Sequence, residues 1–300
     1  MSKPQGSTVL FDALGPRGRR KVMWASLGSG VLFLILVALA VNQLNSGQFF
    51  EQSRWVNPLD ALIVESTWLP SLVSTLKAAA LGSVGAVLLG VIVGMGRVSR
   101  FALIRGIAAV YVQFFRAMPV LLLIFIPFTL DGLTHFTADW LGADNETRRL
   151  IFLVLGLAVY NGAVLAEIVR SGVNSLPPGQ AMAGHAIGLP HGKVMRLIVL
   201  PQALRIMLPS VLAQLVILLK DTALGYVITY PELLHGAGFI ANDYGDSYLQ
   251  VFIVAAFVYF VLAWALSQLV KWVERRTGRK TAAKIKTPAA VVATPSAGVP

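Results

Sequence analysis

The sequence predicts an all-α membrane protein that crosses the bilayer several times. Of its 300 residues, 56% are hydrophobic and only 13% are charged, about half the charged share of a soluble domain. Apolar runs of about 20 residues, long enough to cross the hydrocarbon core as a helix, recur along the chain. These runs lack the strand-like alternation that is typical of outer-membrane barrels. The three observations together favour a polytopic helical fold.

Six apolar runs each predict one membrane span. They fall near residues 22–44, 71–96, 106–130, 150–169, 206–229 and 249–272. The first run follows a basic stretch and contains Ala38-Leu39-Ala40, a combination that resembles a signal peptide. Because the run is longer than a usual signal-peptide core, an uncleaved anchor is favoured. The tails at 1–21 and 278–300 lack apolar periodicity and are expected to be disordered.

The charges predict the orientation of the chain in the membrane. Lys and Arg outnumber Asp and Glu by 25 to 14, and they gather in both tails and in the loops after the second and fourth runs. The remaining loops carry most of the acidic residues. This positive-inside pattern predicts two cytoplasmic termini and an even number of spans. The basic excess then reflects topology and attraction to anionic lipid headgroups, and a nucleic-acid partner is not expected.

The longest cytoplasmic connection, residues 170–205, contains "SLPPGQAMAGHAIGLPHGKVMRLIVLP" at 175–201. Pro177 and Pro178 suit the first turn of a helix, and Gly188 followed by Pro190 ends it. A second amphipathic segment then leads to Pro201, where it is expected to stop. A short helix of this kind could dock into a groove of another protein, although a merely structured loop would also fit the pattern.

The same stretch resembles the EAA loop of the integral-membrane permeases of binding-protein-dependent ABC importers. That loop reads Glu-Ala-Ala, three residues, Gly, nine residues, then Ile-x-Leu-Pro. Five residues fall in register with it, namely Ala183, Gly188, Ile198, Leu200 and Pro201. Met182 stands where the family has Glu, and Gly184 where it has Ala. The resemblance implies that these seven positions couple the chain to an ATPase, with Met182 docking by apolar packing.

Three further stretches extend the resemblance over about residues 71–272. They are "FFRAMPVLLLIF" (114–125), "AEIVRSGVNSLPPGQ" (166–180) and "LPQALRIMLPSVLAQLVILLKDTAL" (200–224), and they are similar to the polar amino acid uptake branch, with an overall likeness to glutamate permeases. The resemblance implies a five-span permease domain over 71–272 with its coupling loop at 170–205. Residues 22–44 are then an additional N-terminal span in a protein of the bacterial cytoplasmic membrane.

The resemblance also implies a set of partners. These are two cytoplasmic ATPases that use ATP and magnesium, a second permease subunit and an external solute-binding protein. A heterodimer of permeases is favoured because Met182 departs from the family pattern, so that the other subunit could retain the acid. Neither the amino acid transported nor the composition of the dimer follows from the sequence.

Ionisable residues inside the spans are candidates for the substrate pathway, because burying them in lipid is costly. Arg116 lies near the helix breaker Pro119, and Lys220 and Asp221 lie deep in the fifth run beside Thr222. Each could meet the charges of an amino acid or could be neutralised by neighbouring helices. Outside this set, Lys77 is expected to snorkel to the outer surface. Glu167 and Arg170 are expected to form a local i, i+3 pair.

Other functions are less consistent with the sequence. The chain has no cysteine, so disulfides and cysteine metal sites are excluded. The stretch "GLPHGKV" (188–194) has one residue too few between its glycines for a phosphate loop, and Val194 replaces the Ser or Thr that would bind magnesium. No cofactor is therefore expected on this chain, and an enzyme is disfavoured. The alternative that stays open is an ion-coupled secondary transporter of amino acids.

Overall fold

The computed structural model describes residues 15–282, which form helices and their connections with no strand among them. The chain divides between Asn57 and Pro58 into two units, each described here by itself. Most of the expected tails, 1–21 and 278–300, lies outside the described residues. The described parts of these tails are helical, since 16–21 belong to the first helix and 278–282 to the last. Pro16 at the first helical position explains the earlier start.

The first unit consists of α1 (Pro16–Ser46) and α2 (Gln52–Val56). The span-length part of α1, Arg17–Ser46, has none of its most apolar stretch buried within the protein. An apolar helix whose whole circumference is open requires lipid or another protein around it. The connection to α2 is ordered by Trp55, whose Nε1 donates to the carbonyl of Phe49 over 2.9 Å. The expected span at 22–44 therefore corresponds to α1.

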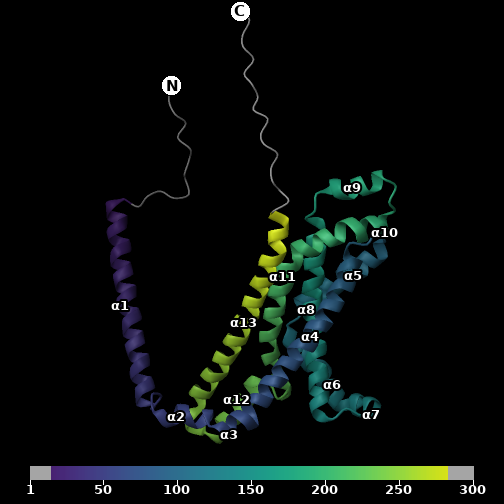
Figure 1. The fold of residues 1–300 in the computed structure, drawn as a ribbon. Coiled ribbons are helices and arrows are strands. Elements are labelled where there is room, and N and C mark those ends of the chain that lie inside the picture. The colour runs from purple at the N-terminus through teal and green to yellow at the C-terminus, as the bar shows by residue number, and fades with distance from the viewer. Residues whose placement is uncertain (1–14, 283–300) are drawn as a thin grey trace, which may run out of the picture. The chain divides into compact units, whose positions relative to one another are not determined.

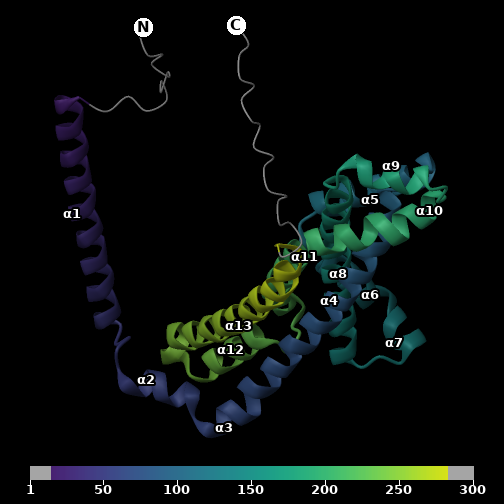
Figure 2. The same cartoon turned by 45° about the horizontal axis from the view of Figure 1, so that its top comes forward.

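The second unit contains the remaining elements (Figure 1). In chain order they are η1 (Asn57–Leu59), α3 (Ala61–Ile63), η2 (Val64–Trp68), α4 (Leu69–Arg97), α5 (Ala102–Ala117), α6 (Val120–Thr134), α7 (Phe136–Leu141), α8 (Asn145–Asn174), α9 (Pro178–Ala186), α10 (His191–Val194), η3 (Met195–Val199), α11 (Leu200–Asp221), η4 (Thr222–Ile228), α12 (Leu233–Asp243), η5 (Gly245–Ser247) and α13 (Tyr248–Ala282). Both views place α9 and α12 at opposite ends of this unit (Figure 1, Figure 2).

Four long helices of the second unit are apolar and long enough to cross a membrane. They comprise residues Ala61–Arg97, Asn145–Asn174, His191–Ile228 and Gly245–Arg275. The span expected at 106–130 is the pair α5 and α6, which is bent by 94° at the expected helix breaker Pro119. Pro119 lacks the amide that would continue α5, and Met118 before it is extended at φ −80° and ψ 138°. The chain therefore turns sharply at this point and does not run straight through.

The helix expected to stop at Pro201 continues through it. Residues His191–Asp221 run without a break because the turn Met195–Val199 opens into a π-helix. A proline leaves the carbonyl four residues earlier without its donor, and a wider turn just before the ring relieves this mismatch. A second π-helical turn, Val64–Trp68, precedes Pro70 in the same way. Both prolines are thus accommodated inside long helices.

The core of the second unit lies between α4, α8 and α11. Leu153, Leu157 and Leu218 are fully buried there. Glycines bring α4 and α8 unusually close: a Cβ on Gly90 would lie 2.5 Å from that of Leu165, and a Cβ on Gly94 2.6 Å from that of Val169. Small residues at such crossings allow the backbone contact that drives helix association in lipid.

We expect Gly90→Leu to weaken the contact between α4 and α8. The added side chain has no room against Leu165, and overpacking of this kind typically costs about 1–3 kcal/mol. Thermal unfolding in mild detergent, followed by the amount of folded protein that remains, measures the effect. Gly106→Leu is the matched control, because nothing lies within 4 Å of a Cβ at Gly106. Equal losses in the two variants would contradict the packing described.

Candidate functional site

The first candidate site is α9 together with the segment that follows it. The helix begins at Pro178 and ends in a Schellman motif, in which the Gly188 amide donates to the His185 carbonyl over 2.9 Å and the Leu189 amide to the Gly184 carbonyl over 3.2 Å. Gly188 has a φ of +81°, a value that favours glycine. The predicted short helix and its end at Gly188 are therefore confirmed.

Gly184 fixes α9 against the long helix that begins at His191. Gly184 is buried, and a Cβ on it would lie 2.7 Å from Ile198 Cδ1 and 2.9 Å from Val194 Cγ2. An alanine would therefore have to displace the side chains of Val194 and Ile198 or move α9 away from them. The family has Ala at this position. Here the residue is Gly184, and the two helices approach each other unusually closely at it. Gln202 adds a weak bond from its Nε2 to Oε1 of Gln180 on α9 over 3.4 Å.

The other side of α9 is apolar and open. Met182 is 62% exposed and Ile187, just beyond the helix, is 75% exposed, with Ala183 exposed as well. Ile198 and Leu200 are half-buried, and Pro201 is exposed. Of the seven predicted coupling positions, Met182 and Ala183 form an outward set. Gly184, Ile198 and Leu200, which are buried or half-buried, form a packing set, and Gly188 and Pro201 belong to neither. Ile187 was missed by the sequence analysis, although its place directly before the terminating glycine could have indicated it.

A charged cluster holds α4 and α8 together at the end where α8 leads into α9. Arg170 Nε donates to Glu167 Oε1 over 3.0 Å, so the predicted i, i+3 pair is confirmed. Arg97 of α4 joins the same carboxylate, with Nη2 3.3 Å from Glu167 Oε2. One carboxylate therefore pairs with two guanidinium groups from two helices. This arrangement orients the connection at 175–177 that carries α9.

The candidate pathway residues occupy different surroundings. Arg116 is exposed at the end of α5, beside the break at Pro119. Lys220 lines a pocket of about 520 Å³ against α13, while Asp221 interacts with Asn161 of α8. Thr222 is fully buried and donates to the carbonyl of Leu219 over 2.7 Å. These contacts connect α11 to α8 and α13, and Arg116 takes no part in them.

A buried amide pair next to Asp221 was missed by the sequence analysis. Gln214 Nε2 donates to Asn161 Oδ1 over 2.7 Å, and Asn161 Nδ2 donates to the Leu157 carbonyl over 3.0 Å. Asn161 is fully buried and Gln214 is 9% exposed. The search of the spans considered ionisable side chains only, whereas an amide inside an apolar run carries a similar signal. The pair connects α8 to α11 within the core.

A second buried polar group, Glu232, fixes the segment after Thr222. Its carboxylate caps α12 by accepting from the amides of Leu234 (2.8 Å) and His235 (2.7 Å), and it accepts from the hydroxyl of Tyr259 over 2.6 Å. Glu232 is fully buried, and this burial raises the pKa of its carboxyl group. It is therefore a structural cap and not the ordinary loop charge that its position in the sequence indicated. The adjacent Leu233 amide donates to Thr75 Oγ1 of α4 over 3.0 Å.

The fold and site define a polytopic helical membrane protein in which the short helix α9, outside the spans, carries an exposed apolar surface. Residues 86–279 match the family described as "Binding-protein-dependent transport system inner membrane component". The chain belongs to this family, whose members are membrane components of transport systems and not catalytic subunits. Its assignment to amino acid transport rests on the relatives and the solved structure described next.

Two relatives are permeases of acidic amino acids. The chain is 37% identical over 229 residues to "Glutamate transport system permease protein GluD" of Corynebacterium glutamicum, covering 74% of this chain and 81% of the relative. It is 35% identical over 211 residues to "Glutamate/aspartate import permease protein GltK" of Escherichia coli, covering 70% and 92%. The chain is therefore the permease component of an amino acid ABC importer, and the comparisons give no support to an ion-coupled transporter.

Solved structures agree with this assignment. The structure titled "Crystal structure of an amino acid ABC transporter with histidines" matches with a TM-score of 0.64 and 27% identity, covering 74% of this chain and 98% of that one. An inward-facing structure of the MetNI methionine ABC transporter matches with a TM-score of 0.52 and 20% identity, covering 71% and 97%. The second likeness shows the fold alone.

We expect Asn161→Leu and Gln214→Leu to be strongly coupled in stability. Either change alone leaves a buried amide without its partner, whereas the double change removes both groups. A double-mutant cycle of unfolding in detergent should give a coupling energy of about 0.5–1.7 kcal/mol, the range found for polar pairs in membranes.

Asn161→Leu combined with Ser267→Ala is the control cycle for this pair. The Ser267 hydroxyl bonds within its own helix, to the carbonyl of Ala263, so that cycle should be additive. An additive result for Asn161 and Gln214 themselves would show that their contact is absent in the membrane protein.

Proposed function

We propose that this permease forms half of an import pathway for acidic amino acids, with glutamate as the principal substrate. The relatives named for glutamate and aspartate support this substrate class. Two cations, Arg116 and Lys220, lie on α5 and α11 within segments long enough to be spans, where a substrate carboxylate could meet them. Asp221 offers a carboxylate for the substrate ammonium, and Pro119 and Thr222 shape the backbone beside these groups.

We further propose that α9 docks into a partner ATPase that hydrolyses ATP with magnesium. The observation that carries this proposal is the exposed apolar surface of Met182, Ala183 and Ile187 on a helix outside the spans. Exposed apolar residues gathered on one short element are typical of a protein interface. The packing set, made up of Gly184, Ile198 and Leu200, keeps that surface in a fixed position relative to α11, while Gly188 ends α9 and Pro201 lies within the long helix.

Movement of the ATPase reaches the pathway through a continuous helix. Because Gly184 lies against Val194 and Ile198, a displacement of α9 must move η3 with it. The helix His191–Asp221 has no break, so η3 cannot move without α11. Lys220 and Asp221 lie at the far end of that helix, and Thr222 directly follows it. Closing and opening of the ATPases thereby alternates access to the substrate site.

The complex that this mechanism requires contains two ATPases, a second permease and an external solute-binding protein. We favour a heterodimer of permeases, since Met182 replaces the family's Glu and a partner that retains the acid would supply the polar contact. In this arrangement both termini lie in the cytoplasm. The C-terminal end of α13 supports this orientation for the C-terminus, because it lies at the same end of the second unit as α9 (Figure 1).

We expect Ile187→Asp to uncouple ATP hydrolysis from transport. A carboxylate in the centre of an apolar contact loses its hydration without gaining a partner, which costs more than 1 kcal/mol. The measurement is ATP hydrolysis stimulated by loaded binding protein, together with glutamate uptake, in vesicles that contain the whole complex. The matched control is Asn174→Asp, because Asn174 is exposed at the end of α8 that leads into α9. Wild-type coupling in the Ile187 variant would rule out docking through this surface.

We expect Arg116→Gln and Lys220→Gln each to lower glutamate uptake by about tenfold or more, because a charge-assisted hydrogen bond contributes about 1.5–3 kcal/mol. Lys77→Gln removes an exposed cation of α4 expected to contact lipid headgroups, and should leave uptake unchanged. Initial uptake rates are measured at a saturating concentration of binding protein. A change in the rate then reports on the pathway and not on capture of the substrate. If all three variants transport equally well, the proposed cations do not contact the substrate.

A further inference from the structure

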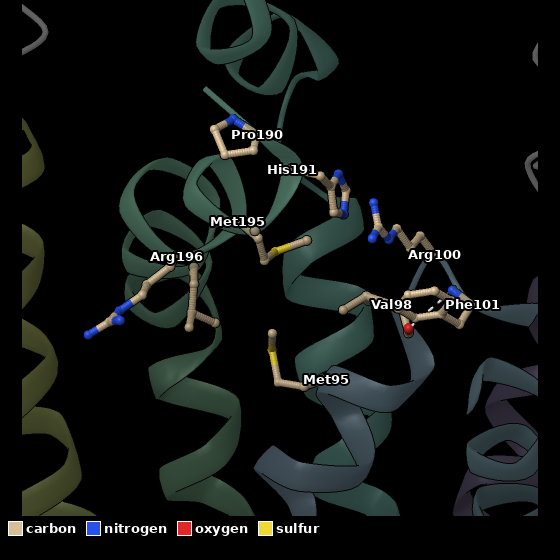
Figure 3. A pocket seen from close by; sticks show the side chains of 11 residues that line it. Met95, Val98, Arg100, Phe101, Pro190, His191, Met195 and Arg196 are labelled. Carbon is tan, nitrogen blue, oxygen red and sulfur yellow. Dashed lines mark hydrogen bonds between the residues drawn. The ribbon is translucent and has the colours of Figure 1, made fainter. Parts of the chain in front are cut away.

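A pocket of about 700 Å³ lies beside α9 and takes no part in the function proposed above. One wall is the end of α4 with the loop to α5, and the other is the start of the long helix at Pro190–Leu200 (Figure 3). Its interior is apolar: the side chain of Met95 extends toward Met195, which lies across the space, and Val98 lies beside them. Methionine adapts to flexible apolar ligands, because its side chain is unbranched and polarizable.

Cationic and polar nitrogen groups border this apolar interior. Arg100 extends next to the ring of His191 on one rim, while the guanidinium of Arg196 on the opposite wall points away from the pocket (Figure 3). All three residues are exposed, and no carboxylate lines the pocket among the residues that the structure describes. The pocket therefore complements a ligand that combines an anionic group with an apolar chain.

The loop that carries Arg100 is held in place by its neighbours. Arg105 Nη1 donates to the Ser99 carbonyl over 3.1 Å, and the Phe101 amide donates to Ser99 Oγ over 3.2 Å. The guanidinium of Arg100 lies 4.8 Å from the centre of the Phe101 ring, a cation–π contact. This contact holds the Arg100 side chain at the rim of the pocket.

The pocket lies where the apolar spans end. Met95 belongs to the last turns of the span Ala61–Arg97, and Leu200 lies in the span His191–Ile228. On α5, directly after the pocket loop, Leu103 is 76% exposed and Ile107 63% exposed. Open apolar residues on a span face lipid or a neighbouring span, and the end of a span lies at the level of the lipid headgroups. The pocket is therefore within reach of a lipid molecule in the membrane.

We propose that this pocket binds an anionic diacyl phospholipid. The phosphate accepts hydrogen bonds from Arg100 and from a ring N–H of His191, and an acyl chain lies across Met95 and Met195. Basic pockets between spans are known to select anionic headgroups in this way. Because one wall carries Pro190 and His191, which directly follow α9, the bound lipid also holds the start of the long helix against the loop between α4 and α5.

Native mass spectrometry of the complex with its ATPases tests the proposal. The purified complex is mixed with phosphatidylglycerol or with phosphatidylcholine, and the lipids that stay bound are counted. Wild type should retain phosphatidylglycerol with a severalfold preference, and Arg100→Gln should lose that preference. Arg205→Gln is the matched control, since Arg205 is an exposed cation of α11 outside the pocket. An equal loss in both variants, or no preference in wild type, would overturn a specific site.

Photo-crosslinking identifies the occupant directly. A benzophenone amino acid in place of Met195 should yield a product with the mass of the chain plus one phospholipid when the complex is irradiated in phosphatidylglycerol vesicles. A product with the ATPase or the second permease would mean that a protein covers the pocket, and the proposal would be wrong. Competition by inorganic phosphate alone, at a concentration equal to that of the lipid, would show that the site binds a free anion instead.

Discussion

The contact of Gly184 with Val194 and Ile198 is the constraint on which the proposed mechanism depends. It brings α9 into close contact with the start of the long helix. The absence of a side chain at Gly184 permits this approach, and the Schellman motif at Gly188 turns the chain back so that the contact can form. The exposed apolar surface of α9 is thereby packed directly against the start of the long helix.

The membrane environment explains how the remaining polar groups are used. In lipid, a buried amide or carboxylate has no water to bind, so each must find a partner within the protein. Asn161 and Gln214 satisfy each other between α8 and α11, and Glu232 is satisfied by two backbone amides and Tyr259. These bonds fix the segments on both sides of Asp221 and Thr222. The candidate pathway residues thus lie on a framework that is held by hydrogen bonds as well as by glycine packing.

The sequence predicted the helical class, the number of apolar runs and the short helix before Gly188, because length, hydropathy and local breakers determine these features. Its predictions at prolines were right in one case and wrong in the other. Pro119, expected as a helix breaker, bends a span by 94°, whereas Pro201, expected to stop a helix, is absorbed into one by a π-helical turn. The local signal of a proline is the same in both cases, and the packing of neighbouring helices decides between the two outcomes. Asn161 and Glu232 were missed for a related reason, since their burial depends on helices distant in the sequence.

Site-specific crosslinking tests the central claim, that α9 transmits the movement of the ATPase, most directly. The chain contains no cysteine, so Met182→Cys introduces a single attachment site for a thiol-reactive benzophenone. The account predicts that this site crosslinks to the ATPase in the assembled complex and that the crosslinked complex no longer alternates access. Ile107→Cys on the open face of α5 provides the comparison. A Met182 site that labels only lipid or solvent, or a crosslinked complex that still transports, would contradict the account.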